Sequence, residues 1–333
     1  MTQTIYTQQI KNSAAWMGNT LAQQTSWIYH LSQAEINELD AAIGLLVSLN
    51  KPISEIRKEE FPLKILATGI AKWSDELNSG LGFVLVRGFP SEKYSVKENS
   101  LAYWLIGRHL GEPISQNSDG EVVVSIRDTG ANPNEANTRL YKTRAEQDFH
   151  TDGADIIGLL CLQKSKSGGA SRIVSSVSVY NEIVRQRPDL SPLMFEDFYW
   201  HLHGQHLPNQ PPYFKLPICA IKNGHFRMFY LGWYIRKAQE LEGVPKLSAE
   251  QNEVLELLES IANNPKFYLD MSFEKGDMQF LKNSVILHKR TSYEDFTEPE
   301  QKRHLLRLWL VERNFVDGDE TLRQGIQKKE VAE

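Results

Sequence analysis

His150 and Asp152 place an imidazole and a carboxylate, two groups that bind transition metals, one residue apart. On a β-strand, residues i and i+2 point to the same face, so the two groups would lie side by side. With one distant histidine they would form a 2-His-1-carboxylate set, which binds Fe(II) and leaves neighbouring coordination positions open. Because the chain has 9 histidines, about 0.5 matches to His-x-Asp are expected by chance, so the pair needs support from its context.

The candidate for the distant histidine is His288, which follows the apolar run 285–287. A ligand at the end of an apolar strand lies where a buried site on a rigid scaffold requires it. The alternative is a surface histidine beside Lys289 and Arg290, and position alone does not decide between the two.

Two arginines occur in the segment RHLLRLWL at 303–310. On a strand, Arg303 and Arg307 share one face with Leu305 and Trp309. A buried guanidinium is costly unless it is paired, and its planar shape suits a carboxylate. Internal salt bridges or a bound carboxylate would each explain the pair.

Short β-prone segments separated by turn residues dominate the chain after residue 80. The predicted strands are 81–89, 122–126, 156–162, 173–174 with its flanks, 267–273, 277–281, 285–287 and 305–312. The predicted helices are 32–49, 62–77, 99–110, 178–187 and 248–261, and the segment 208–217 is expected to be a long connection. Capping-box pairs open the first and last of these helices at Ser32/Glu35 and Ser248/Gln251. Ser178 is expected to cap the helix that runs to Arg187. Strands on both sides of one helical insertion indicate a β-sandwich or barrel decorated by helices.

The composition excludes several classes of protein. The chain has 333 residues, 37 Lys plus Arg against 42 Asp plus Glu, and 41% hydrophobic residues, as expected for a folded soluble protein. No Lys/Arg block supports nucleic-acid binding, and no apolar run reaches the roughly 18–20 residues of a membrane span. The polar N-terminus shows no secretory signal, so a cytoplasmic location without nucleic-acid or membrane partners is expected. Cys161 and Cys219 are too few for a disulfide framework and are expected to be free thiols.

Four motifs lie in order along the chain: FHTDGADIIGLLCL (149–162), GGASRIVSS (168–176), GD-x4-KNSVILHKRTSYED (276–295) and RHLLRLWL (303–310). This series resembles the taurine dioxygenase (TauD/TfdA)/clavaminate synthase-like family of Fe(II)- and 2-oxoglutarate-dependent oxygenases. The resemblance begins near residue 81, where LGFVLVRGFP looks like an early strand of that family, and ends near 311. It implies that His150, Asp152 and His288 are the iron ligands.

The resemblance also implies roles for three further residues. Arg303 resembles the arginine that pairs with the distal carboxylate of the cosubstrate 2-oxoglutarate, and Ser171 takes the place of a hydroxyl residue that shares this carboxylate. Arg307 resembles a second arginine, which approaches an acidic substrate group in some members. Spacing does not settle which arginine holds 2-oxoglutarate, and we prefer Arg303. Lys289 follows His288 where a small residue is frequent, so it would narrow the pocket or face solvent.

The implied fold is mainly β with peripheral helices, built on a double-stranded β-helix (jelly-roll, clavaminate synthase-like) core. We expect one oxygenase domain over 1–333, with its core at about 81–312, a helical packing region at 1–80 and a loose charged tail at 317–333. The implied reaction uses Fe(II), 2-oxoglutarate and dioxygen to hydroxylate an unactivated C–H bond of a small molecule, with release of succinate and CO2. The second arginine suggests a substrate that carries a carboxylate or sulfonate.

Two alternatives remain. A metal-dependent β-sandwich oxygenase or a binding module that uses no 2-oxoglutarate would leave Arg303 and Ser171 unexplained. A second histidine cluster at His201, His203 and His206 could bind zinc, line the substrate pocket, or consist of ordinary surface histidines.

Overall fold

The computed structural model describes residues 7–117, 120–132, 140–203 and 209–312. His206 and the expected charged tail at 317–333 lie outside these residues. Among the residues described, no helix is long and apolar enough to cross a bilayer. Cys161 and Cys219 are both buried free thiols, as the sequence predicts.

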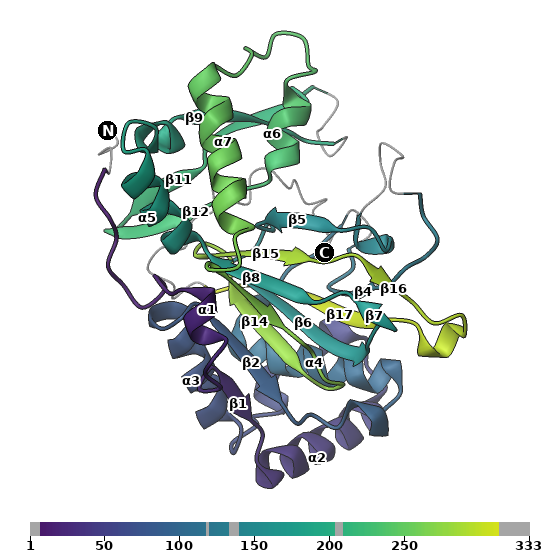
Figure 1. Ribbon diagram of the computed structural model, residues 1–333. Coiled ribbons are helices and arrows are strands. Elements are labelled where there is room, and N and C mark those ends of the chain that lie inside the picture. The colour runs from purple at the N-terminus through teal and green to yellow at the C-terminus, as the bar shows by residue number, and fades with distance from the viewer. Residues whose placement is uncertain (1–6, 118–119, 133–139, 204–208, 313–333) are drawn as a thin grey trace.

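Two β-sheets face each other at the centre of the molecule (Figure 1). The larger sheet contains, in spatial order, β1 (Ile28–His30), β2 (Phe83–Arg87), β14 (Met278–Lys282), β6 (Ile156–Gln163), β17 (His304–Val311) and β3 (Glu112–Pro113), and β4 (Val123–Ile126) also pairs with β17. The smaller sheet contains β13 (Tyr268–Met271), β8 (Ser171–Ser175), β15 (Ile286–Arg290) and β5 (Gln147–His150). The predicted β-rich core is therefore confirmed.

The larger sheet is buried on both faces because its strands alternate two sets of apolar side chains. In β2, Phe83 and Leu85 belong to a core that also contains residues of the smaller sheet. Val84 and Val86 belong to a second core on the opposite face. The strands of this sheet therefore read as continuous apolar runs rather than as half-polar ones.

Helices cover the second core, as predicted for the outside of the β structure. The helices α2 (Gln33–Leu49), α3 (Ala67–Ser79) and α4 (Val96–Leu110) lie on the outer face of the larger sheet (Figure 1). The capping box predicted for α2 is present, since Ser32 accepts from the Glu35 amide and Glu35 accepts from the Ser32 amide. The helix predicted at 62–77 begins five residues later, because the backbone of Leu63 takes a positive φ of 39°.

The insertion between β8 and β13 contains more β-strands than the sequence predicts. It contains α5 (Ser176–Gln186), α6 (Gly232–Ala238), α7 (Ala249–Ala262) and the hairpins β9 (Asp197–His201)/β10 (Tyr213–Pro217) and β11 (Cys219–Lys222)/β12 (His225–Met228). The expectation of a simple connection at 208–217 is thus wrong for its second half, because β10 pairs with β9. The capping box predicted for α7 is present at Ser248 and Gln251.

The cap of α5 also differs from the prediction. Ser178 is not the first residue outside the helix; Ser175 caps it, and its hydroxyl accepts from the Ser178 amide. The hydroxyl of Ser178 instead donates to the carbonyl of Trp16. The remaining short elements are α1 (Gly18–Leu21), the paired β7 (Ser167–Gly168) and β16 (Tyr293–Glu294), and the 3-10 turns η1 (Ile53–Glu55), η2 (Lys58–Glu60), η3 (Ser91–Lys93), η4 (Leu140–Lys142), η5 (Ser191–Phe195) and η6 (Pro299–Gln301).

Candidate metal centre

The smaller sheet brings the two candidate histidines together. β15 runs antiparallel to β5, and His288 lies directly opposite His150 in the register. Their ring centroids are 4.2 Å apart. One pair of neighbouring strands thus brings together two histidines that lie 138 positions apart in the sequence.

Asp152 joins this pair from a loop, not from a strand. β5 ends at His150, so the predicted strand alternation does not orient the carboxylate. Asn283 fixes the backbone of Asp152 instead: its side-chain oxygen accepts from the Asp152 amide over 2.9 Å, and its side-chain nitrogen donates to the Asp152 carbonyl over 2.6 Å.

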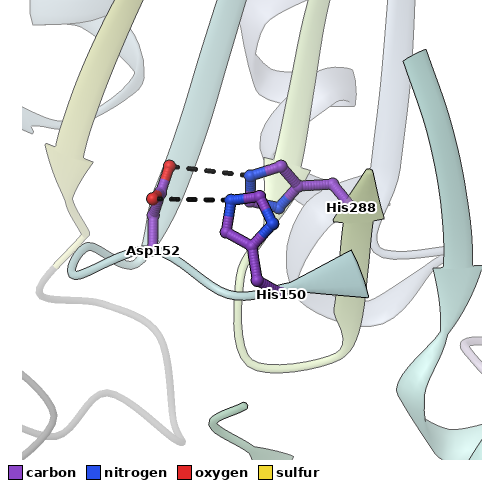
Figure 2. Close-up of side chains that lie close together, drawn as sticks. All are labelled: His150, Asp152 and His288. Atoms are coloured by element: carbon purple, nitrogen blue, oxygen red, sulfur yellow. Dashed lines mark ion pairs between the residues drawn. The ribbon is translucent and has the colours of Figure 1, made fainter. Parts of the chain in front are cut away.

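The three side chains converge on one point (Figure 2). Nε2 of His150 lies 3.9 Å from Oδ1 of Asp152, and Nε2 of His288 lies 3.6 Å from Oδ2. One donor atom from each residue lies within 4.8 Å of the others. Among the residues described, this is the group of three with metal-binding geometry.

The hydrogen bonds of His150 fix the tautomer that a metal requires. Nδ1 lies 2.7 Å from the carbonyl of Asp148, which can only accept, so Nδ1 carries the proton. Nε2 accepts from the side-chain amide of Gln147 over 3.0 Å and therefore has its lone pair directed into the site. Metal-binding histidines commonly hold their second nitrogen in this way.

Electrostatics keep the site in the protonation state that metals bind. Burial and the neighbouring His288 lower the pKa of His150 to about 3, so the imidazole is neutral. Burial alone would raise the pKa of Asp152, but Arg307 and the two imidazoles outweigh it and hold this pKa well below its usual range. A neutral imidazole and a carboxylate anion are the forms that coordinate a cation.

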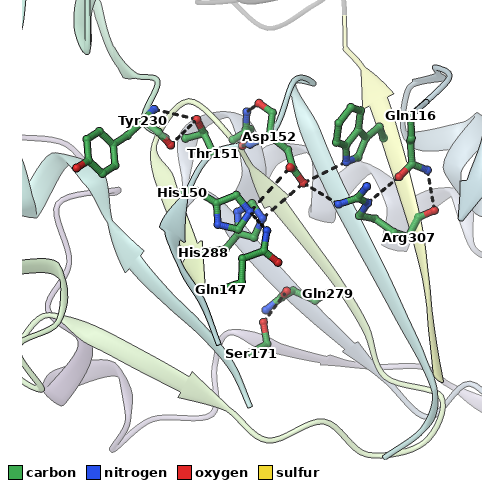
Figure 3. Close-up of polar contacts among 12 residues, drawn as sticks. Gln116, Gln147, His150, Thr151, Asp152, Ser171, Tyr230, Gln279, His288 and Arg307 are labelled. Carbon is green, nitrogen blue, oxygen red and sulfur yellow. Dashed lines mark hydrogen bonds and ion pairs between the residues drawn. The ribbon is translucent and has the colours of Figure 1, made fainter. Parts of the chain in front are cut away.

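Two donors of β17 anchor the Asp152 carboxylate. Nη1 of Arg307 lies 3.4 Å from Oδ2 (Figure 3). Nε1 of Trp309 lies 3.2 Å from the same oxygen. Nε of Arg307 donates to the side-chain oxygen of Gln116 over 2.7 Å. Sequence reasoning singled out Trp309 on the arginine face but missed Gln116, which lies 191 positions before Arg307 and carries no local signal.

A cavity beside this His-Asp-His group is lined by every residue that the sequence analysis proposed for the site. They are His150, Asp152, Ser171, His288, Arg303 and Arg307. Apolar side chains form much of the remaining wall, and Tyr141, Gln147 and Arg290 also line it. The cavity therefore joins a metal-binding end to an end that is rich in arginine.

Arg303 is buried without a counter-ion. It is 4% exposed, its Nη1 has no hydrogen-bond partner, and it forms no ion pair with any residue that the structure describes. Burial lowers its pKa. Internal salt bridges therefore do not explain Arg303, whereas Arg307 pairs with Asp152. Ser171, the hydroxyl residue of the same end, donates to the side-chain oxygen of Gln279 over 3.1 Å.

Two further sequence expectations concern residues near the site. Lys289 does not face solvent: it is buried, and its ammonium pairs with Glu146 over 2.5 Å and donates to the Asn263 side chain over 2.7 Å. Nδ1 of His201 accepts from the amide of His203 over 2.8 Å, and no third ligand joins the two within the described part of the chain.

Two facing sheets, a His-x-Asp pair with a distant histidine, and an unpaired buried arginine at the far end of one cavity define a class of protein. This class is the mononuclear non-haem Fe(II)- and 2-oxoglutarate-dependent oxygenases. Comparison with known families agrees. The family described as "Taurine catabolism dioxygenase TauD, TfdA family" matches residues 49–309, and the chain belongs to this family.

Two relatives match over most of their length. The FR-33289 synthase of Streptomyces rubellomurinus is 30% identical over 328 residues, covering 96% of each chain. The taurine hydroxylase-like protein SAT17 of Stachybotrys chartarum is 28% identical over 312 residues, covering 90% of this chain and 79% of the relative.

Solved structures share the fold at lower identity. The non-heme iron oxygenase OrfP in complex with Fe and alpha-ketoglutaric acid has a TM-score of 0.62 and 15% identity, over 85% of this chain and 94% of OrfP. An asparagine oxygenase in complex with Fe(II), 3-hydroxyasparagine and succinate has a TM-score of 0.61 and 14% identity, over 85% and 93%. These neighbours confirm the predicted jelly-roll core.

Proposed function

We propose that this chain hydroxylates a small molecule with one Fe(II) bound by His150, Asp152 and His288. The observation that carries the proposal is the cavity that joins this cluster to the unpaired Arg303. When bound, iron and 2-oxoglutarate would supply the oxidising power for attack on a C–H bond, with succinate and CO2 as by-products. The reaction would be carried by a single domain over residues 1–333, with its core at about 81–312.

Arg303 and Ser171 are the proposed contacts of the distal carboxylate of 2-oxoglutarate. A buried guanidinium without an anion is unfavourable, and a carboxylate offers it bidentate hydrogen bonds. Nη1 of Arg303 has no hydrogen-bond partner, and both residues line the cavity that also contains His150, Asp152 and His288. Arg307 is less suited to this role, because Asp152 and Gln116 already share its guanidinium.

Arg307 is the proposed contact of an acidic substrate group, a carboxylate or a sulfonate. It lines the same cavity but lies at the metal end, where its Nη1 is 3.4 Å from Asp152. A substrate whose C–H bond approaches the metal would bring an anionic substituent within reach of this residue. Arg307 would thereby orient the substrate while it also holds the Asp152 carboxylate.

An anaerobic titration with Fe(II) and then 2-oxoglutarate, followed by visible absorption, tests the proposal. Chelation of the keto acid to ferrous iron gives a weak charge-transfer band that neither component gives alone. We expect this band in the wild type and its loss in Asp152→Ala and His288→Ala. His225→Ala is the matched control, because this histidine is exposed on β12. Iron binding without the band would favour an oxygenase or binding module that uses no 2-oxoglutarate.

A further inference from the structure

A third arginine, Arg290, is buried in the same cavity with unused donors. It is 7% exposed, and its Nε and Nη1 have no hydrogen-bond partner. Its Nη2 donates to the carbonyls of Leu140 and Ala145. Arg290 forms no ion pair with any described residue, and the carboxylate of Asp128, whose charge acts on it, pairs with Arg144 instead.

The place of Arg290 on β15 fits the far end of a cosubstrate bound to the metal. Arg290 follows His288 by two residues on one strand, so both side chains point to the same face, about 7 Å apart along the strand. In the register with β8, Arg290 lies directly opposite Ser171. On β15, His288 therefore lies among the proposed metal ligands, and Arg290 lies at the proposed carboxylate site.

Arg290 and Arg303 meet at Tyr293. Their guanidinium carbons lie 5.3 Å and 5.1 Å from the centre of the Tyr293 ring. The hydroxyl of Tyr293 is buried and has no hydrogen-bond partner. The carboxylates of Asp128 and Asp295 act on these two cations electrostatically but form no ion pair with either, so a bound anion would offset more of their desolvation.

We propose that Arg290 is a second binding residue for the distal carboxylate of 2-oxoglutarate. This carboxylate would lie between Arg290 and Arg303. The inference rests on the proposed function, because it names a further residue for the same cosubstrate. A carboxylate has about four lone-pair sites, enough for two guanidinium groups and a hydroxyl. Sharing the carboxylate between two arginines makes the site selective for dicarboxylic over monocarboxylic 2-oxo acids.

The test compares 2-oxoglutarate with 2-oxopentanoate, a keto acid of the same chain length without the distal carboxylate. Dissociation constants are measured anaerobically on the Fe(II)-loaded protein from the charge-transfer band, and succinate binding to the metal-free protein is measured by calorimetry. The variants are Arg290→Gln and Arg290→Lys. Arg172→Gln is the control, because Arg172 is the neighbour of Ser171 on β8 but pairs with the exposed Asp270.

We expect Arg290→Gln to weaken 2-oxoglutarate and succinate binding about tenfold or more, as for loss of a charged hydrogen bond. Binding of 2-oxopentanoate should change less than twofold, and Arg172→Gln should behave as the wild type. Arg290→Lys, which keeps the charge, should show a smaller loss in the same direction, and it carries the test if Arg290→Gln fails to fold.

Two results would overturn the inference. Unchanged 2-oxoglutarate binding in the variants, or an equal loss for both keto acids, would leave Arg290 with a structural role through Leu140 and Ala145. A wild-type protein that binds iron but gives no band with 2-oxoglutarate would instead overturn the proposed function itself. The control measurement on the wild type therefore separates the two failures.

Discussion

The side-chain amide of Gln147 donates a hydrogen bond to Nε2 of His150 over 3.0 Å, at the nitrogen that faces Asp152 (Figure 3). A metal ion bound by His150 needs the same lone pair. Gln147 must therefore release His150 when the metal binds, and its amide then becomes available to a molecule in the cavity that it lines.

This competition makes Gln147→Ala informative. The variant loses a hydrogen bond worth about 0.5–1.5 kcal/mol that stabilises the metal-free site. We expect Co(II) to bind the variant about twofold to tenfold more tightly than it binds the wild type. Competition with a chromophoric chelator measures this affinity. Gln24→Ala, on the exposed N-terminal segment, is the control. Weaker binding in Gln147→Ala would show that the amide supports the metal site rather than competes for it.

Arg303 and Arg307 should differ in their kinetic effects. Arg307→Gln should raise the KM of the substrate far more than that of 2-oxoglutarate, and Arg303→Gln should do the reverse. The substrate for this comparison comes from a screen of small carboxylates and sulfonates for stimulated succinate release. Metal affinity is measured in parallel, because Arg307 also contacts Asp152. Equal effects of Arg307→Gln on both KM values, or none, would contradict its role at the substrate.

A buried ion pair outside the site should contribute strongly to stability. Asp277 is fully buried and accepts from Nε and Nη2 of Arg87 over 3.0 Å and 2.7 Å. Asp277→Ala removes both of these hydrogen bonds and leaves Arg87 with the exposed Glu274 as its remaining ion-pair partner, so we expect a loss of up to about 3 kcal/mol in the free energy of unfolding. The pair of Arg172 with Asp270 is more exposed, so Asp270→Ala should cost at most about 1 kcal/mol. Urea denaturation measures both, and equal losses would contradict the difference in burial.

The two thiols should be inert in the folded protein. Burial raises the pKa of Cys161 to about 12 and that of Cys219 well above its usual value. The thiolate is the reactive form, so almost none is present at pH 8. Mass spectrometry after iodoacetamide treatment without reductant should show no adduct on native protein and two on unfolded protein. Unfolded protein that takes up no adduct until a reductant is added would reveal a disulfide.

The parts of this protein that the sequence predicted are those with local causes. Ser32 and Glu35 form the capping box of α2 because both partners lie within one helical turn. Arg303 and Arg307 line one cavity as predicted, because they lie four residues apart, Arg307 on β17 and Arg303 immediately before it. The order of motifs containing His150, Asp152 and His288 indicated the metal cluster and the family. Ser178 was a wrong cap for α5 because its local sequence offers several serines, of which packing selects Ser175.

Tertiary structure alone decided how these residues act on one another. Asn283 orients Asp152 across 131 positions, and Gln116 binds Arg307 across 191. Only the register of β15 with β8 sets Arg290 opposite Ser171. The sequence left open which arginine lacks a partner, because ion pairs depend on side chains that distant strands bring together. Residue types and their spacing thus determined the chemistry available to this protein, whereas strand pairing determined which donors remain free for a ligand.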